Sequence, residues 1–80
     1  VGNMTIEKIK NKIDDNINKK VVIKYNGSRN KTEVYSGVIL ESYNYVFIVK
    51  LDGEKTMSFS YVDVLTKSIE VKFLAIWVHN

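Results

Sequence analysis

The spacing of apolar residues changes once along this chain, from a helical period near the N-terminus to an alternating period after it. The four isoleucines of the first segment are Ile6, Ile9, Ile13 and Ile17. Their spacings of three, four and four residues place them on one face of a helix. From Lys20 onward apolar and polar residues alternate, as in strands with one buried face. The pattern predicts an N-terminal amphipathic α-helix, capped by Thr5, followed by strands.

Five strands are expected from the alternation and from the turn residues that separate them. They are residues 20–25, 31–42, 45–51, 55–60 and 68–73. The pairs Asn26-Gly27 and Asp52-Gly53 predict tight turns. Gly37 interrupts the second strand and predicts a bulge or a sharp bend. Between the last two strands, residues 61–65 indicate a short helical turn, which Asp63 is expected to cap.

Short strands joined by tight turns favour a small, strongly bent sheet over a flat one with long exposed edges. We therefore expect a mainly β fold, a small five-stranded SH3-like barrel preceded by the helix. The 80 residues form one domain, with the helix at about 5–18 and the barrel at 20–73. The apolar segment 74–80 either prolongs the last strand, pairs with another subunit or is a foreign tail. Because an apolar strand edge favours self-association, a homodimer is one expectation.

The content of Cys and His limits the chemistry available to the chain. It has no Cys and a single His, His79, one residue from the C-terminus. One imidazole without a thiol supplies neither a Cys–His pair nor the usual zinc sites. No Gly-rich phosphate loop is present. We expect no enzymatic activity, no metal and no cofactor.

Features of membrane or secreted proteins are missing from the sequence. No apolar run approaches the ~18 residues that span a bilayer. No basic segment followed by an apolar stretch marks a signal peptide. With the lack of Cys, this predicts a cytoplasmic protein without membrane partners.

Basic residues concentrate in the segment 19–32, which contains no acidic residue. They are Lys19, Lys20, Lys24, Arg29 and Lys31. The segment carries +5 while the net charge is +3, which leaves −2 for the rest of the chain. Such a hairpin can neutralise phosphates, and nearby tyrosines offer faces on which bases stack.

The candidate recognition surface for a partner or a nucleic acid follows from this charge. It comprises Lys24, Arg29 and Lys31, with Tyr43 or Tyr61 beside them. Arg29 is the only arginine and offers a planar fork for a bidentate contact. The alternative interpretation is a solubilising hairpin with half-buried strand tyrosines.

Several spaced blocks of residues match the sequence pattern of one known family. They are Gly27-Ser28-Arg29-Asn30-Lys31-Thr32, Gly37-Val38-Ile39, Glu41-Ser42-Tyr43, Val46-Phe47-Ile48-Val49 and Ser58-Phe59-Ser60-Tyr61-Val62-Asp63-Val64-Leu65-Thr66. Through them the chain resembles the Veg proteins of Gram-positive bacteria, from about residue 4 to residue 73. The resemblance implies a cytosolic SH3-like domain without enzymatic activity, which stimulates biofilm formation by opposing a repressor of matrix genes. The chain departs from the family pattern at Asn30, Asn44 and Phe59, where a basic residue, a proline and a tyrosine are usual.

Two classes of function remain open on this basis. The first is a regulatory module that binds a protein, such as a transcription factor, as the resemblance implies. The second is a nucleic-acid-binding module, similar in architecture to Sm-like RNA proteins, that uses the basic 19–31 hairpin. The second predicts an affinity that falls steeply with salt. The modest net charge and the lack of an aromatic RNA-reading motif favour the first.

Overall fold

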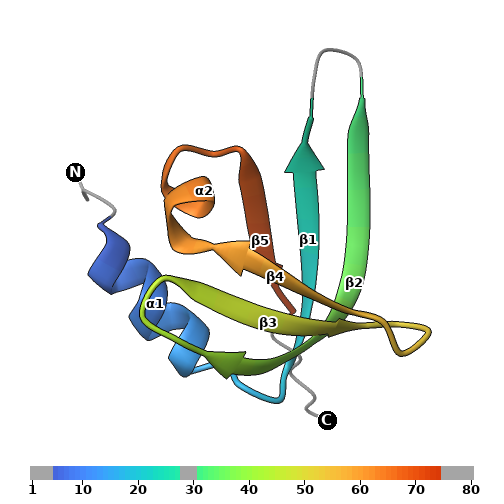
Figure 1. The fold of residues 1–80 in the computed structure, drawn as a ribbon, viewed down its shortest axis with the longest axis horizontal. Coiled ribbons are helices and arrows are strands. Elements are labelled where there is room, and N and C mark those ends of the chain that lie inside the picture. Colours follow the sequence, from blue (N-terminus) through green and yellow to red (C-terminus); the bar gives the residue numbers. More distant parts are fainter. Residues whose placement is uncertain (1–4, 28–30, 75–80) are drawn as a thin grey trace, which may run out of the picture.

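The computed structural model of the chain describes residues 5–27 and 31–74 (Figure 1). Its elements in chain order are α1 (Ile6–Asp14), β1 (Lys20–Asn26), β2 (Thr32–Ser42), β3 (Val46–Leu51), β4 (Thr56–Ser60), α2 (Tyr61–Leu65) and β5 (Ile69–Phe73). The expected order of one helix, four strands, a short helix and a last strand is therefore confirmed. The expectations for Arg29 and for residues 75–80 lie outside the described residues.

Helix α1 begins at its predicted cap and ends earlier than predicted. The Thr5 hydroxyl accepts a hydrogen bond from the backbone N–H of Lys8 at 3.2 Å. The helix stops at Asp14 rather than near Ile17, and Asn18 adopts a positive φ of 69°. Asn tolerates this left-handed conformation, which redirects the chain into β1. Ile17 therefore packs against the core from a turn and not from the helix.

The five strands form one antiparallel sheet with the order β4-β3-β2-β1-β5. The long strand β2 pairs with β1 through residues 32–38 and with β3 through residues 37–42. It thus runs beside β1 at one end and beside β3 at the other (Figure 1). The β2–β3 register shifts between Ile39 and Glu41, so the irregularity lies two to four residues after Gly37. The prediction of a bulge at Gly37 itself is wrong.

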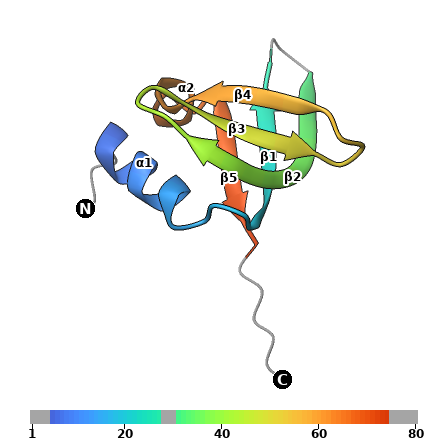
Figure 2. The ribbon, with the colours of Figure 1, turned by 60° about the horizontal axis from the view of Figure 1, so that its bottom comes forward.

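The sheet is strongly bent but not closed within the described residues, so the expected SH3-like barrel is not confirmed. Figure 2 shows β3, β4 and the second part of β2 crossing the direction of β1 and β5. Strands β4 and β5 are the two edges of the sheet, and no ladder joins them. Helix α2 connects these edges and contacts both strands as well as α1. Helix α2 therefore lies where β4 and β5 would have to pair with each other to close the sheet.

The N-cap of helix α2 is Ser60 and not Asp63, the cap expected from the sequence. The Ser60 hydroxyl accepts a hydrogen bond from the backbone N–H of Val62 at 3.1 Å. Asp63 lies in the first turn of the helix, where a negative charge is favoured by the exposed N–H groups. The last residue of β4 therefore ends the strand and starts the helix.

The core lies between α1 and the concave face of the sheet. Ile9 and Ile13 of α1 are buried against apolar residues from every strand. Phe47 occupies the centre, with ring centroids 5.7 Å from Phe59 and 5.5 Å from Tyr61. The isoleucine face of the helix is thus a packing surface, as the spacing predicted.

Candidate functional site

The sequence-predicted recognition residues do not share one surface. Lys24 is exposed on the convex face of β1, because its neighbours Ile23 and Tyr25 face the other side. Lys31 instead contributes to an open hollow of about 310 Å³ beside the turn of the β1–β2 hairpin. Tyr43 follows the far end of β2, about 40 Å from Lys31 measured along the bent strand. A single ligand of ordinary size would not reach all three.

Tyr61 cannot contribute to a surface because its side chain is fully buried, with 0% exposure. Its ring stacks on Phe47, and its hydroxyl makes no hydrogen bond within the described part of the chain. Burial raises the pKa of this phenol above its usual value. The expectation that Tyr61 is a recognition residue is therefore wrong, since alternation along β4 carries it inward with Met57 and Phe59.

The charge of Lys20 is balanced by an acid that is distant in sequence. The Lys20 Nζ lies 3.4 Å from Oδ1 of Asp52 in the β3–β4 turn. The Ser36 hydroxyl donates to the other oxygen of Asp52 at 2.6 Å. The Ser36 bond and the nearby Lys20 hold the pKa of Asp52 below its usual value. This arrangement removes one charge from the basic segment.

Two further acids lie among the remaining lysines. Glu70 on β5 stands opposite Lys24 in the β1–β5 register and accepts a hydrogen bond from the Asn26 side chain at 3.1 Å. Glu33 lines the same hollow as Lys31. The Tyr35 hydroxyl donates to Glu33, and this bond raises the pKa of Tyr35. Strand pairing therefore places Glu70 beside Lys24, while Glu33 follows the basic segment directly in sequence.

A cluster of exposed apolar side chains lies at the opposite end of β2. We call Tyr43, Tyr45 and Val62 the tyrosine turn; their exposed fractions are 50%, 80% and 53%. Tyr43 and Tyr45 flank the β2–β3 connection, and the N–H of Tyr61 donates to the carbonyl of Tyr45 at 3.1 Å. This bond brings the start of α2, and hence Val62, beside the turn.

Hydrogen bonds hold the tyrosine turn in one conformation. The N–H of Tyr43 donates to the carbonyl of Val46 at 2.8 Å, and its hydroxyl donates to the Glu41 carboxylate. The sequence analysis named Tyr43 but missed Tyr45, which reads as the first residue of an apolar strand. The available signal was the pair of tyrosines on either side of Asn44 in a short connection.

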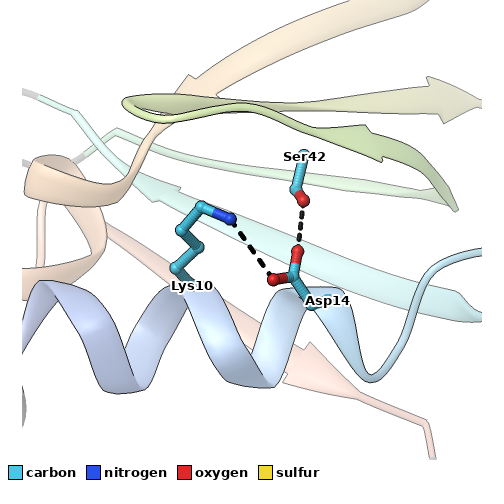
Figure 3. A network of polar contacts seen from close by, with 3 residues as sticks. All are labelled: Lys10, Asp14 and Ser42. Atoms are coloured by element: carbon cyan, nitrogen blue, oxygen red, sulfur yellow. Dashed lines mark hydrogen bonds and ion pairs between the residues drawn. The ribbon is translucent and has the colours of Figure 1, made fainter.

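Helix α1 is joined to the end of β2, directly before the tyrosine turn, by polar contacts (Figure 3). The hydroxyl of Ser42, at the end of β2, donates to the Asp14 carboxylate, and Lys10 Nζ lies 3.3 Å from the same carboxylate. The Ser42 bond, with a smaller effect of Lys10, holds the pKa of Asp14 below its usual value. The last residue of α1 is therefore tied to the residue that precedes Tyr43.

Metal-binding clusters and membrane-spanning helices are the last features to consider. Among residues 5–27 and 31–74, no group of three His, Cys, Asp or Glu side chains is placed to hold a metal ion. In the same part of the chain, no helix has the length and apolar character needed to cross a bilayer. Exposed apolar side chains lie at the tyrosine turn, and β4 and β5 are edge strands of the sheet.

Comparison with known proteins extends these observations. The family model described as "Biofilm formation stimulator VEG" matches residues 4–72. The matched region contains both helices and all five strands apart from the last residue of β5. No curated protein gives a significant match to the chain. The resemblance noted in the sequence is therefore confirmed.

Proposed function

Because this chain belongs to the Veg family of biofilm formation stimulators, we propose that it acts as a non-enzymatic regulatory protein in the cytoplasm. It stimulates biofilm formation by binding a protein that controls transcription. Its open, bent sheet serves as an SH3-like scaffold that presents loops and strand edges to the partner. The family is described by a regulatory outcome and not by a reaction.

The observation that carries this proposal is the tyrosine turn. Tyr45 is 80% exposed, the highest value among the large hydrophobic side chains of the described residues. Tyrosines supply much apolar contact area at a small entropic cost and are enriched among the residues that dominate protein interfaces. The backbone bonds of the turn and the Ser42–Asp14 tie hold the backbone that carries these rings in place before binding. Such preorganisation lowers the cost of ordering an interface.

The charge distribution gives less support to nucleic-acid binding. Lys20 is paired with Asp52, and Glu70 and Glu33 lie next to Lys24 and Lys31. A nucleic-acid groove needs phosphate-binding cations on one continuous surface. Here Lys24 and Lys31 lie on different faces of the sheet.

The proposal is tested by complementing a bacterial strain that lacks this gene. The double substitution Tyr43→Ala and Tyr45→Ala is expected to abolish the stimulation of biofilm formation, because it removes the exposed rings. The melting temperature of the purified variant should stay within a few degrees of the wild type, since both rings are at least half exposed. The matched control is Val34→Ala, which removes an apolar side chain that is 61% exposed on another part of the sheet.

Full biofilm stimulation by the stable double variant would disprove the role of the tyrosine turn. A second measurement separates the two function classes: the fluorescence anisotropy of labelled duplex DNA and single-stranded RNA at two salt concentrations. We expect no binding at either concentration. Tight binding that weakens steeply with salt would replace the protein partner with a nucleic acid.

A further inference from the structure

Among the described residues, no strand pairs with the outer edge of β4. The N–H of Tyr61 donates to Tyr45, and the N–H of Leu51 donates to Lys55. These bonds fix the phase of the β3–β4 ladder, in which odd-numbered residues of β4 point their N–H and C=O groups toward β3. The N–H groups of Thr56, Ser58 and Ser60 and the carbonyls of Thr56 and Ser58 therefore point away from the sheet, while the carbonyl of Ser60 belongs to the cap of α2.

The β4 edge lacks the features that usually prevent edge-to-edge pairing. Its sequence, Thr-Met-Ser-Phe-Ser, contains no charge and no proline, and its pairing with β3 has no register shift. The other edge strand, β5, carries the exposed charges Glu70 and Lys72. Figure 2 shows β4 at the outer margin of the part of the sheet formed by β2, β3 and β4. Of the two edges, β4 is the one suited to pairing.

An apolar hollow lies beside this edge on the concave side. It has a volume of about 260 Å³ and is lined mainly by aromatic and aliphatic side chains, among them Tyr25, Tyr35 and Phe59. Met57 of β4 also lines the hollow and is only partly buried. An added strand that alternates in the same way would place its own apolar side chains over this hollow.

We propose that the partner at this edge is a second copy of the chain, joined through antiparallel β4–β4 pairing about a twofold axis. The register that uses all three outward-facing residues places Ser58 opposite Ser58 of the partner subunit. Thr56 then lies opposite Ser60 of the partner subunit. On the concave side, Met57 lies opposite Phe59 of the partner subunit and covers the hollow.

Charge complementarity favours a second copy over an unrelated strand. Lys55 precedes β4 and faces the same side as Met57, whereas Asp63 lines the hollow beyond the other end of β4. Antiparallel pairing brings Lys55 of one copy to the end of β4 where Asp63 of the partner subunit lies. Both side chains are exposed, and neither forms an ion pair with another described residue of its own chain. The twofold axis creates this contact twice.

The first test measures the mass of the purified protein by sedimentation over a range of micromolar concentrations. We expect a reversible monomer–dimer equilibrium. The Ser58→Pro substitution removes an N–H that points away from β3, so it should abolish the dimer and preserve the circular dichroism spectrum. A wild-type protein that stays monomeric throughout would overturn the proposal.

A charge exchange provides a second test that does not depend on how well the proline variant folds. Lys55→Glu or Asp63→Lys alone places like charges together and should weaken dimerisation by about tenfold. The double variant restores opposite charges and should return the dissociation constant to near the wild-type value. The matched control is Lys50→Glu, which changes an exposed lysine of β3 and should leave the dimer intact.

Equal weakening by both single variants without recovery in the double variant would exclude this register. The result is separate from the proposed function, because the tyrosine turn and the β4 edge have no residue in common. A double Tyr43→Ala and Tyr45→Ala variant should still dimerise. If the protein does not dimerise, the biofilm prediction is unaffected. If the tyrosine variant still stimulates biofilm formation, the dimer prediction is unaffected.

Discussion

At Gly37, β2 pairs with β1 on one side and with β3 on the other. A Cβ at this position would lie 2.3 Å from the carbonyl oxygen of Lys50 and 2.9 Å from the Cα of Leu51. Both atoms belong to the backbone of β3 and cannot rotate away. We therefore expect Gly37→Ala to lower the free energy of unfolding by about 1–3 kcal/mol, as measured by urea denaturation.

Gly53 provides the matched comparison for Gly37. It has a φ of 91°, and a Cβ there would meet no atom within 4 Å. Gly53→Asn changes only the local backbone preference, and Asn is among the residues that accept positive φ most readily. This variant should cost less than Gly37→Ala. The opposite order would show that turn geometry, and not the approach of β3, limits stability.

The tie between α1 and β2 sets how firmly the helix is held to the sheet. Ser42 and Lys10 hold the pKa of Asp14 below its usual value of 3.8, so the ionised form is favoured in the folded state. This stabilisation is present above about pH 4 and is lost as the pH falls through the lowered pKa. Asp14→Asn should therefore lower the urea midpoint at neutral pH, and its difference from the wild type should disappear in acid.

Asp15→Asn is the control for this pH dependence. It removes the same charge at the next position, whereas the Ser42 hydrogen bond and the Lys10 ion pair belong to Asp14. Its difference from the wild type should be smaller than that of Asp14→Asn at neutral pH. A difference for Asp14→Asn that stays constant from neutral to acidic pH would refute the role of the carboxylate.

The whole molecule depends on one core to which the helix and every strand contribute. Ile13 is fully buried between α1 and the sheet, and it lies near Val64 of α2 and Phe73 of β5. Ile13→Ala should cost about 2–5 kcal/mol. Because helix and sheet share this core, unfolding followed by circular dichroism and by tyrosine fluorescence should give the same midpoint in the variant. A helical signal that is lost at lower urea than the tyrosine signal would show that α1 unfolds independently.

Much of this organisation follows from local patterns in the sequence. The isoleucine spacing, the alternation in the strands and the Gly-containing turns predicted every helix and strand. These patterns are reliable because they depend on which face of a segment is buried. The same alternation predicted that Tyr61 is buried, since it places Tyr61 on the same side as Met57 and Phe59. The prediction that Tyr61 is a recognition residue rested on its aromatic ring and ignored this alternation.

Only the tertiary structure decided which residues lie together. Asp52 and Glu70 lie far from the basic segment in sequence, and strand pairing and the β3–β4 turn bring them beside its lysines. The same pairing leaves β4 as an edge strand among the described residues. The sequence by itself determined the elements and their buried faces, because these depend on neighbouring residues. Charge balance, surface clusters and free edges depend on contacts between distant residues, which local spacing does not encode.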